Sequence, residues 1–241
     1  MALSLFTSPA LKKYRNALVH LVFPRTCLLC DIELQPQERC MCRKCIHKLP
    51  YTKYETLENN PVDQLFWGKV RVEKAMALLF FRKGERPQKI LHHIKYRHAT
   101  DLGIGMGELI GKRLMGANFI NPIDVVVPIP LHPRRLKHRG YNQSELIAQG
   151  ICRVSGLPLL PKAIERSINT ETQTHKNRFE RHLNVHRIFA VPNPKQLEGK
   201  HILLIDDVVT TGATLEACIN QLKLIPGTRV SVAALAWATD F

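Results

Sequence analysis

The stretch HILLIDDVVTTGATL, residues 201–215, decides the fold of this chain. Its apolar run Ile202–Ile205 is typical of a buried strand in a parallel sheet, and two adjacent carboxylates, Asp206 and Asp207, follow directly. The run Thr210–Thr214, TTGAT, then opens an amphipathic helix. The inner side of that helix is expected to carry Leu215, Cys218, Ile219 and Leu222. Charge and hydroxyl groups at the end of a buried strand indicate a ligand site rather than a core element.

The residues around this turn favour a sugar phosphate as the ligand. Backbone N–H groups, a helix N-terminus and hydroxyl groups meet at Thr210–Thr214, and together they favour a phosphate. Asp206 and Asp207 repel phosphate, so ribose hydroxyls and Mg²⁺ suit them better, which predicts a ribose 5-phosphate with metal-bound pyrophosphate. The alternative is an ordinary turn whose Asp and Thr residues only cap. The complete order of residues favours the ligand site and closely resembles the phosphoribosyl pyrophosphate (PRPP) motif of type I phosphoribosyltransferases.

The composition is that of a folded globular protein with a strongly basic surface. The chain has 241 residues, of which 45% are hydrophobic and 23% charged, without low-complexity tracts or internal repeats. Lys and Arg outnumber Asp and Glu by 35 to 20, which gives a net charge of +15 and a pI near 9.8. Such a surface attracts polyanions, so nucleic acid is the first partner class and anionic lipid the second. A solvated basic face without a partner is the alternative.

The sequence predicts no transmembrane segment, because no stretch approaches the roughly 20 apolar residues that span a bilayer. Near the N-terminus, apolar side chains share one helical face, which would dock on the protein itself or make peripheral contact with a membrane. That face consists of Leu11, Tyr14, Leu18, Leu21 and Val22. No small-residue cleavage site follows, so we expect no signal peptide and a cytoplasmic location.

Five of the seven cysteines lie in residues 27–45, in a pattern typical of zinc. The two CxxC pairs are Cys27 with Cys30 and Cys42 with Cys45. Two such turns supply tetrahedral four-thiolate coordination, which makes the predicted zinc structural rather than catalytic. Disulfides are the alternative, which a reducing cytoplasm disfavours. Cys40 and His47 are further candidate ligands, so the choice of four stays open, with the CxxC pairs preferred.

The segment after the cysteines predicts one strand and two helices. Val70–Arg82 is expected to be the strand, and helices are expected over Pro87–His98 and Leu102–Leu114. The outer side of the first helix is expected to carry Lys89, Lys95 and Arg97.

A second buried strand, Ile123–Pro130, leads into the loop Leu131–Gly140, which holds basic residues and no acid. Because loops at the carboxyl ends of parallel strands lie on the ligand face, this loop is expected to share a face with the Asp pair. Arg134 and Arg135 predict a pyrophosphate ligand, since arginines bind diphosphate oxygens through paired N–H donors. A solvated charge run is the alternative. A helix that Asn142 caps is expected to follow.

The polar segment Lys162–Arg187 is too long for an ordinary connection and too poor in apolar residues for a core element. We therefore expect a mobile functional loop, with a disordered excursion as the alternative. The candidates for closing over a bound anion are Gln173, Lys176, Arg178, Arg181 and Asn184.

The ordered combination of a four-cysteine front, PIPLHPRRLKHRGYNQSELIA, TQTHKNRFERHLNV and ILLIDDVVTTGAT resembles the ComF/GntX family over Cys27–Ala236. The resemblance implies an α/β fold in residues 70–241, a type I phosphoribosyltransferase-like parallel sheet flanked by helices. It implies an N-terminal helix and a small zinc-ribbon-like module in residues 1–60. Competence members are associated with natural transformation, where they handle incoming single-stranded DNA at the cytoplasmic side of the inner membrane. Other competence proteins, such as a DNA-translocating helicase or channel, are implied as partners.

The resemblance also implies roles for individual residues. Ribose and Mg²⁺ would be bound by Asp206 and Asp207. Pyrophosphate would be bound by Arg134 and Arg135, under a hood that carries Arg178 and Arg181. The 5-phosphate of PRPP would be bound by Thr210, Thr211, Gly212, Ala213 and Thr214. Zinc would be bound by Cys27, Cys30, Cys42 and Cys45, with Cys40 outside the paired pattern.

Two functions from different classes follow. As a binding protein, the chain would bind PRPP while its basic surface holds single-stranded DNA. Aromatic residues near basic ones are candidate stacking partners, although a place in the core or at its rim is the favoured interpretation: Tyr51, Tyr54, Phe66, Trp67, Tyr96 and Tyr141. As an enzyme, the chain would move ribose 5-phosphate from Mg²⁺·PRPP to an acceptor and expel pyrophosphate. The catalytic residues would be Asp206, Asp207, Arg134 and Arg135. No stretch of the sequence indicates an acceptor pocket. Mainly because of the family resemblance, we expect DNA handling, with the transferase as the alternative.

Overall fold

The computed structural model describes residues 24–166 and 188–238. The chain divides into two compact units, Met1–Lys48 and Leu49–Phe241. The apolar N-terminal face and the segment with Arg178 and Arg181 lie outside the described residues. Among the described helices, none is long and apolar enough to cross a membrane.

The first unit contains the short helix α2 (Arg43–His47), and the second contains the remaining elements. Its strands are β1 (Ala75–Phe81), β2 (Val125–Pro128), β3 (Glu165–Arg166), β4 (Phe189–Ala190), β5 (His201–Val209) and β6 (Arg229–Ala238). Its helices are α3 (Pro61–Gln64), α4 (Arg86–Tyr96), α5 (Thr100–Gly116), α6 (Pro133–Arg139), α7 (Gln143–Ser155), the 3₁₀ helix η1 (Pro194–Leu197) and α9 (Ala213–Leu222).

A parallel sheet in the order β1-β6-β5-β2 forms the centre of the second unit. Its strands are rich in Val, Ile, Leu and Ala and are buried on both faces, as a parallel sheet between helices requires. Residues 158–160 extend the sheet beyond β2, because the Val126 N–H donates to Pro158 O and the Leu160 N–H donates to Val126 O, each at 2.9 Å. The predicted α/β fold is confirmed.

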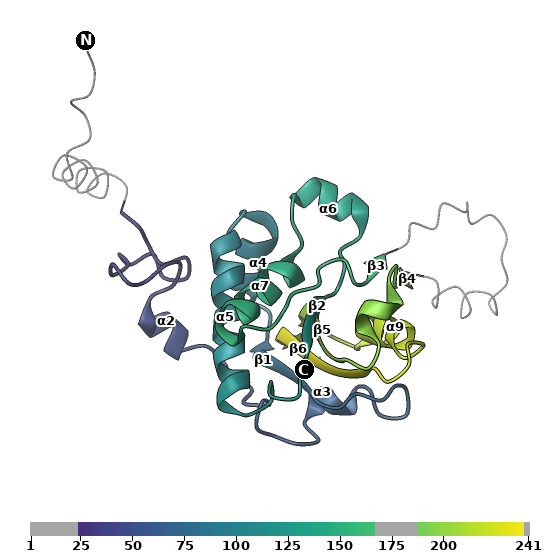
Figure 1. Cartoon of the computed structure of the whole chain (residues 1–241). Coiled ribbons are helices and arrows are strands. Elements are labelled where there is room, and N and C mark those ends of the chain that lie inside the picture. The colour runs from purple at the N-terminus through teal and green to yellow at the C-terminus, as the bar shows by residue number, and fades with distance from the viewer. Residues whose placement is uncertain (1–23, 167–187, 239–241) are drawn as a thin grey trace, which may run out of the picture. The chain divides into compact units, whose positions relative to one another are not determined.

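The chain leaves β2 and β5 in opposite directions. From β2 it passes through α7 to residues 158–160 at one edge, and from β5 it passes through α9 to β6 on the other side. Because such crossovers are right-handed, α7 and α9 belong on opposite faces, and Figure 1 shows them on the two sides of the sheet. The carboxyl ends of β2 and β5 therefore flank a topological switch point, where open α/β sheets bind ligands.

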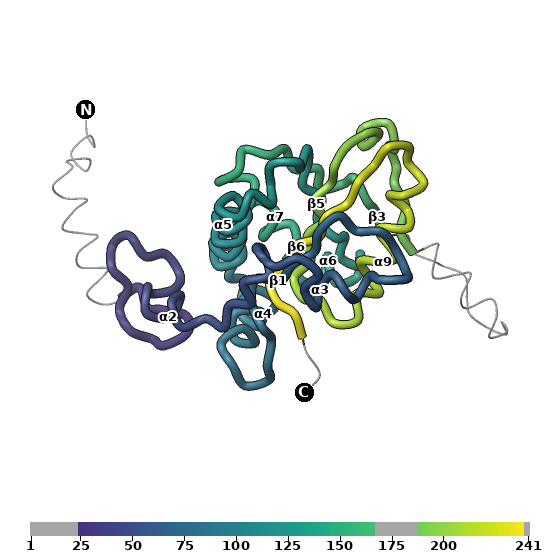
Figure 2. The backbone as a smooth tube through the Cα atoms, turned by 90° about the horizontal axis from the view of Figure 1, so that it is seen from below, coloured from purple at the N-terminus to yellow at the C-terminus, as the bar shows by residue number. Residues whose placement is uncertain are grey.

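Helices α5 and α7 lie side by side on one face of the sheet (Figure 2). Glycines, which have no Cβ atom, allow the backbones of α5 and α7 to approach closely. A Cβ atom added at Gly107 would lie 2.0 Å from Ile147 O. A Cβ added at Gly150 would lie 2.1 Å from Ile104 O. Both atoms belong to the backbone of the facing helix, so neither contact can be relieved by a side-chain rotation.

We expect Gly150→Ala to lower the free energy of unfolding by about 2–3 kcal/mol, because the two helices must move apart. Gly105→Ala is the matched control, since Gly105 lies in α5 with nothing within 4 Å of its added Cβ. The control should stabilise the protein by up to about 1 kcal/mol through helix propensity. Urea unfolding of both variants measures the difference, and equal effects would contradict the close packing.

Two expected elements differ in the structure. The strand predicted over Val70–Arg82 begins only at Ala75, because residues 70–74 approach the sheet as an irregular segment. The loop predicted over Leu131–Gly140 contains helix α6. Pro133 occupies the first helical turn, the His132 side chain accepts a hydrogen bond from the Arg134 N–H, and Gly140 ends the helix with φ of 82°.

Residues 49–60, which the sequence analysis grouped with the cysteine module, belong to the second unit in the structure. Residues 50–52 run antiparallel beside β1, where the Thr52 N–H donates to Leu78 O at 3.1 Å and the Phe80 N–H donates to Pro50 O at 2.9 Å. These backbone hydrogen bonds tie the segment to the sheet.

Candidate ligand site and metal centre

Asp206 and Asp207 lie inside β5 rather than after it. The strand runs to Val209, and its pairing with β6 continues through Asp206 opposite Ala234 and Val208 opposite Ala236. The sequence suggests an earlier end because the apolar run stops at Ile205, but the backbone ladder continues beyond the core. The two carboxylates consequently have the fixed backbone of a paired strand.

The N-terminus of α7 meets the Asp206 carboxylate. The Ser144 hydroxyl donates to Asp206 Oδ1 at 3.2 Å, and the Asp207 N–H donates to the same oxygen at 2.8 Å. Asn142 holds this end of the helix, because its side chain accepts from the Ser144 N–H and donates to Ile129 O. The predicted Asn142 cap is confirmed, and it ties the end of β2 to the Asp pair.

Asp206 ionises with difficulty in the ligand-free protein. Burial and the negative charge of Asp207 raise the pKa of the Asp206 carboxyl to about 7, although the hydrogen bonds from the Asp207 N–H and Ser144 and the charge of Lys95 oppose the rise. Two neighbouring carboxylates whose negative charge is only partly balanced by donors and cations of the protein are suited to bind a cation or the hydroxyl donors of a ligand.

Lys95 forms an ion pair with Asp207, with 2.7 Å between Nζ and Oδ2. The side chains are 26% and 16% exposed, so this pair is largely shielded from water. The sequence predicts Lys95 on the outer side of its helix, and it predicts no ligand-site role for Ser144. Both face the Asp pair because the last turn of α4 and the first turn of α7 lie at this edge of the sheet. The topology places them there, and no local sequence signal indicates it.

We expect Asp206→Asn to stabilise the ligand-free protein more at pH 8 than at pH 5. The Asp206 carboxyl loses its proton at about pH 3.9 in the unfolded protein and at about pH 7 in the folded protein. The wild-type protein therefore loses stability as the pH rises between these values. Asn keeps the Oδ1 acceptor without the charge. The gain at pH 8 should be on the order of 1–3 kcal/mol, seen as a higher Tm.

Asp101→Asn is the control for this measurement, since Asp101 is an exposed carboxylate on α5. It should give no gain at either pH. An Asp206→Asn gain that is the same at pH 5 and pH 8 would contradict the raised pKa.

The run Thr210–Thr214 comprises the turn after β5 and the first two residues of α9. Gly212 adopts φ of 77° directly before the helix, and the Glu216 N–H donates to Gly212 O at 2.8 Å. Four of these residues are exposed around the buried glycine: Thr210, Thr211, Ala213 and Thr214. The turn therefore presents hydroxyl groups and a helix N-terminus to solvent, close along the chain to the Asp pair.

Arg134 and Arg135 are exposed on α6, the helix that follows β2. They belong to the segment that leaves the carboxyl end of β2, as predicted. Among the described contacts, neither guanidinium pairs with Asp206 or Asp207. The positions of Arg178 and Arg181 lie outside the described residues.

The four cysteines of the CxxC pairs form one cluster in the first unit. One Sγ from each of Cys27, Cys30, Cys42 and Cys45 lies within 4.8 Å of the others. The Cys30 and Cys42 sulfurs are 3.7 Å apart, close to the edge of about 3.8 Å expected for a tetrahedron with metal–sulfur bonds of about 2.3 Å. Among the described residues, Cys40 and His47 are not members of this cluster.

Backbone N–H groups point at these sulfurs. The Cys42 N–H donates to Cys27 Sγ at 3.3 Å, and the Cys45 N–H donates to Cys42 Sγ at 3.4 Å. Burial opposes ionisation of Cys27, but hydrogen bonds from Cys42, Leu29 and Cys30 outweigh it and lower the pKa of the Cys27 thiol to about 7. Burial and the neighbouring thiols raise the pKa of Cys45. A cation would relieve this crowding of thiols, and a closed four-sulfur set suits structural zinc.

We expect the purified protein to contain one zinc ion per chain. Cys27→Ser and Cys45→Ser should lose the metal and unfold the first unit, because metal binding supplies much of the folding free energy of so small a module. Cys40→Ser should keep the metal. Metal analysis by mass spectrometry reports each variant, and loss of zinc in Cys40→Ser with retention in Cys42→Ser would favour the alternative ligand set.

A cavity of about 980 Å³ lies in another part of the second unit. It is lined by the segment from Tyr54 to Ala75 that leads into β1, and by Phe119 and Lys223 near the ends of α5 and α9. Neither Asp206 nor Asp207 lines this cavity. Its lining residue Phe66 lies beside Gly212 of the turn after β5, because a Cβ added at Gly212 would lie 3.4 Å from the Phe66 ring.

Comparisons with known proteins relate the chain to a domain family and to named relatives. A family model described as a phosphoribosyl transferase domain matches residues 144–238. The DNA utilization protein YhgH of Salmonella typhi is 32% identical over 141 residues, covering 57% of this chain and 61% of that protein. The competence protein ComFC of Bacillus subtilis (strain 168) is 44% identical over 91 residues, covering 38% of this chain and 35% of that protein.

The chain thus matches less than two thirds of the length of either relative. Among solved structures, the glutamine PRPP amidotransferase of B. subtilis is 18% identical with a TM-score of 0.41, covering 57% of this chain and 26% of that chain.

Proposed function

We propose a function for this chain from one premise: it belongs to the ComF family. The chain binds Mg²⁺·PRPP at the carboxyl ends of β2 and β5, and it handles incoming single-stranded DNA in natural transformation. The names of two relatives, a DNA utilization protein and a competence protein, support the second part. The phosphoribosyl transferase domain supports the first.

The observation that carries PRPP binding is the position of the Asp pair. Asp206 and Asp207 lie at the switch point between β2 and β5, beside the N-terminus of α7 and ahead of the Thr210–Thr214 turn. Their carboxylates accept hydrogen bonds from the ribose hydroxyls and attract the Mg²⁺ of the substrate complex. The exposed hydroxyls and N–H groups of the turn take the 5-phosphate. Arg134 and Arg135 bind the pyrophosphate group.

We expect Mg²⁺·PRPP to bind wild-type protein and to bind the Asp206→Ala/Asp207→Ala variant at least about 100-fold more weakly, because two charged acceptors are lost. Asp101→Ala removes an exposed carboxylate of α5 and should bind like wild type. Isothermal titration calorimetry measures all three. No binding by folded, zinc-loaded wild type would remove PRPP from the proposal.

The charge of the chain supports the DNA-handling part. A net charge of +15 exceeds what one small phosphorylated substrate needs, and it attracts a polyanion by counterion release. The proposed location is the cytoplasmic side of the inner membrane, where a reducing environment keeps the zinc-binding cysteines as thiols. A DNA-translocating helicase or channel is the proposed partner that delivers the strand.

The complete Asp pair and TTGAT turn also favour a second candidate, a metabolic phosphoribosyltransferase. Arg134 and Arg135 would stabilise the departing pyrophosphate, and Asp206 and Asp207 would stabilise positive charge on the ribose. Pyrophosphate release from a panel of bases and amines distinguishes the two functions. Release that stops in Asp207→Ala would favour the transferase.

A further inference from the structure

Most of the aromatic side chains that could stack on bases are covered. Tyr54 and Phe66 are only 8% and 1% exposed. The guanidinium of Arg113 lies 4.0 Å from the centre of the Tyr51 ring. The Tyr141 hydroxyl donates to Ile94 O, and that ring is partly buried.

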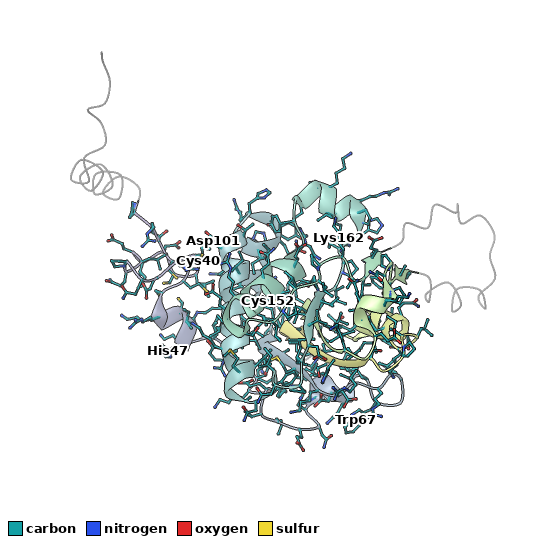
Figure 3. The ribbon with its side chains drawn as sticks, in the orientation of Figure 1. Cys40, His47, Trp67, Asp101, Cys152 and Lys162 are labelled. Atoms are coloured by element: carbon teal, nitrogen blue, oxygen red, sulfur yellow. The ribbon has the colours of Figure 1, made fainter. Side chains whose placement is uncertain are left out.

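Trp67 and Tyr96 are the two that remain, at 59% and 63% exposure. Trp67 lies near α3, at the end of the second unit away from α6 (Figures 1 and 3). It lines the 980 Å³ cavity together with the carboxylates of Glu55, Glu58 and Glu73. The lining also carries Lys69, Arg71, Lys74 and Lys223, so acids and bases are mixed around Trp67. Such surroundings attract a phosphate backbone less than an acid-free cationic surface does.

The surroundings of Tyr96 are different, because α4 and α6 meet there. The Arg139 guanidinium lies 5.5 Å from the centre of the Tyr96 ring, and the His98 and Tyr141 rings are 5.9 Å apart. The hydrogen bond from the Tyr141 hydroxyl to Ile94 O also joins α4 to the residues that follow α6. These contacts bring two cationic stretches that are distant in sequence into one surface.

We define the α4–α6 surface as Lys89, Tyr96, Arg97, Lys137 and Arg139, and Arg134 and Arg135 of the proposed pyrophosphate site adjoin it on α6. Neither residues 86–100 nor residues 125–144 contain an acid. Among the described residues, the exposed cations of this surface form no ion pair with a carboxylate. Its neighbour Lys95 reaches Asp207, so the surface borders the proposed PRPP site.

We propose that a single-stranded nucleic acid binds along the α4–α6 surface, with a base stacked on Tyr96 and phosphates paired with Arg97 and Lys137. An exposed ring between cations favours an unpaired strand, because every base offers a face for stacking only when it is free of a duplex. This inference rests on the proposed DNA-handling function and assigns it a place in the fold, beside the PRPP site.

Two variants probe the two contributions separately, by fluorescence anisotropy with a labelled single-stranded oligonucleotide at several salt concentrations. Tyr96→Ala should weaken binding at least about fivefold while leaving the salt dependence unchanged, because stacking releases no counterions. Arg97→Glu/Lys137→Glu should reduce the slope of log affinity against log salt by about 1.4 or more, since each phosphate contact contributes about 0.7. Neither residue set belongs to the proposed PRPP-binding groups, so calorimetric PRPP binding reports that the fold is intact.

The matched controls lie at the cavity beside Trp67. Trp67→Ala removes an equally exposed aromatic ring, and Lys69→Glu/Lys223→Glu makes the same change in net charge with two exposed lysines. For both controls, the affinity for the oligonucleotide and the slope of log affinity against log salt should be much closer to the wild-type values than those of the α4–α6 variants are. Duplex DNA of the same length should not distinguish Tyr96→Ala from wild type.

The outcomes separate this inference from the function on which it rests. Wild-type protein that fails to bind the oligonucleotide at low salt would overturn the DNA-handling function itself. Wild-type binding that survives in the α4–α6 variants, or falls equally in the Trp67 and Lys69/Lys223 controls, would overturn only the assigned surface. Vesicles with anionic lipids are a further arm. Vesicle binding that depends on Arg97 and Lys137, with no oligonucleotide binding, would assign the surface to a membrane instead.

Discussion

Strand β5 pairs in parallel with β2 on one side and β6 on the other, and the site depends on that double pairing. Parallel neighbours cannot be joined by a tight turn, so the chain must cross the sheet through helices each time. The crossovers from β2 and β5 go in opposite directions, which leaves the carboxyl ends of these two strands uncovered. The N-termini of α7 and α9 then point to the same edge, where the Asp pair of β5 lies.

The electrostatics of this edge are poorly balanced without a ligand. Two adjacent carboxylates lie in a partly buried strand, with one lysine on Asp207 and one hydroxyl on Asp206. Burial and the charge of Asp207 raise the pKa of Asp206 in spite of these partners. A carboxyl that is kept from its ordinary ionisation lowers the free energy of unfolding of the ligand-free protein. Such groups are common at ligand-binding and catalytic sites.

Charge is distributed unevenly around this site as well. Asp206 and Asp207 lie in β5, whereas α4 and α6 carry exposed cations and one exposed tyrosine. The cavity beside Trp67 combines an aromatic ring with acids and bases of both signs. Two exposed aromatic residues that look alike in sequence therefore have different electrostatic surroundings, mixed in charge at Trp67 and cationic at Tyr96, and only the fold distinguishes them.

The sequence by itself determined the elements whose information is local. The apolar run before Asp206, the Asn142 cap and the two CxxC pairs depend on neighbours within a few residues, and each is present in the structure. Local signals also failed in places: the apolar run stops before β5 does, and the basic run with Pro133 and Gly140 forms a helix rather than a loop. In both cases backbone pairing or capping outweighs the side-chain pattern.

Only the tertiary structure decided which distant residues meet. Hydrophobic periodicity tells which side of α4 is apolar, but not which element its polar side faces, so Lys95 could not be assigned to Asp207. Ser144 reaches Asp206 across 62 positions of sequence for the same reason. Tyr96 and Arg139 become neighbours because the helices that carry them are held together by Tyr141. Long-range pairing depends on the order and direction of strands, and a parallel sheet encodes that order in its crossovers rather than in any single stretch of residues.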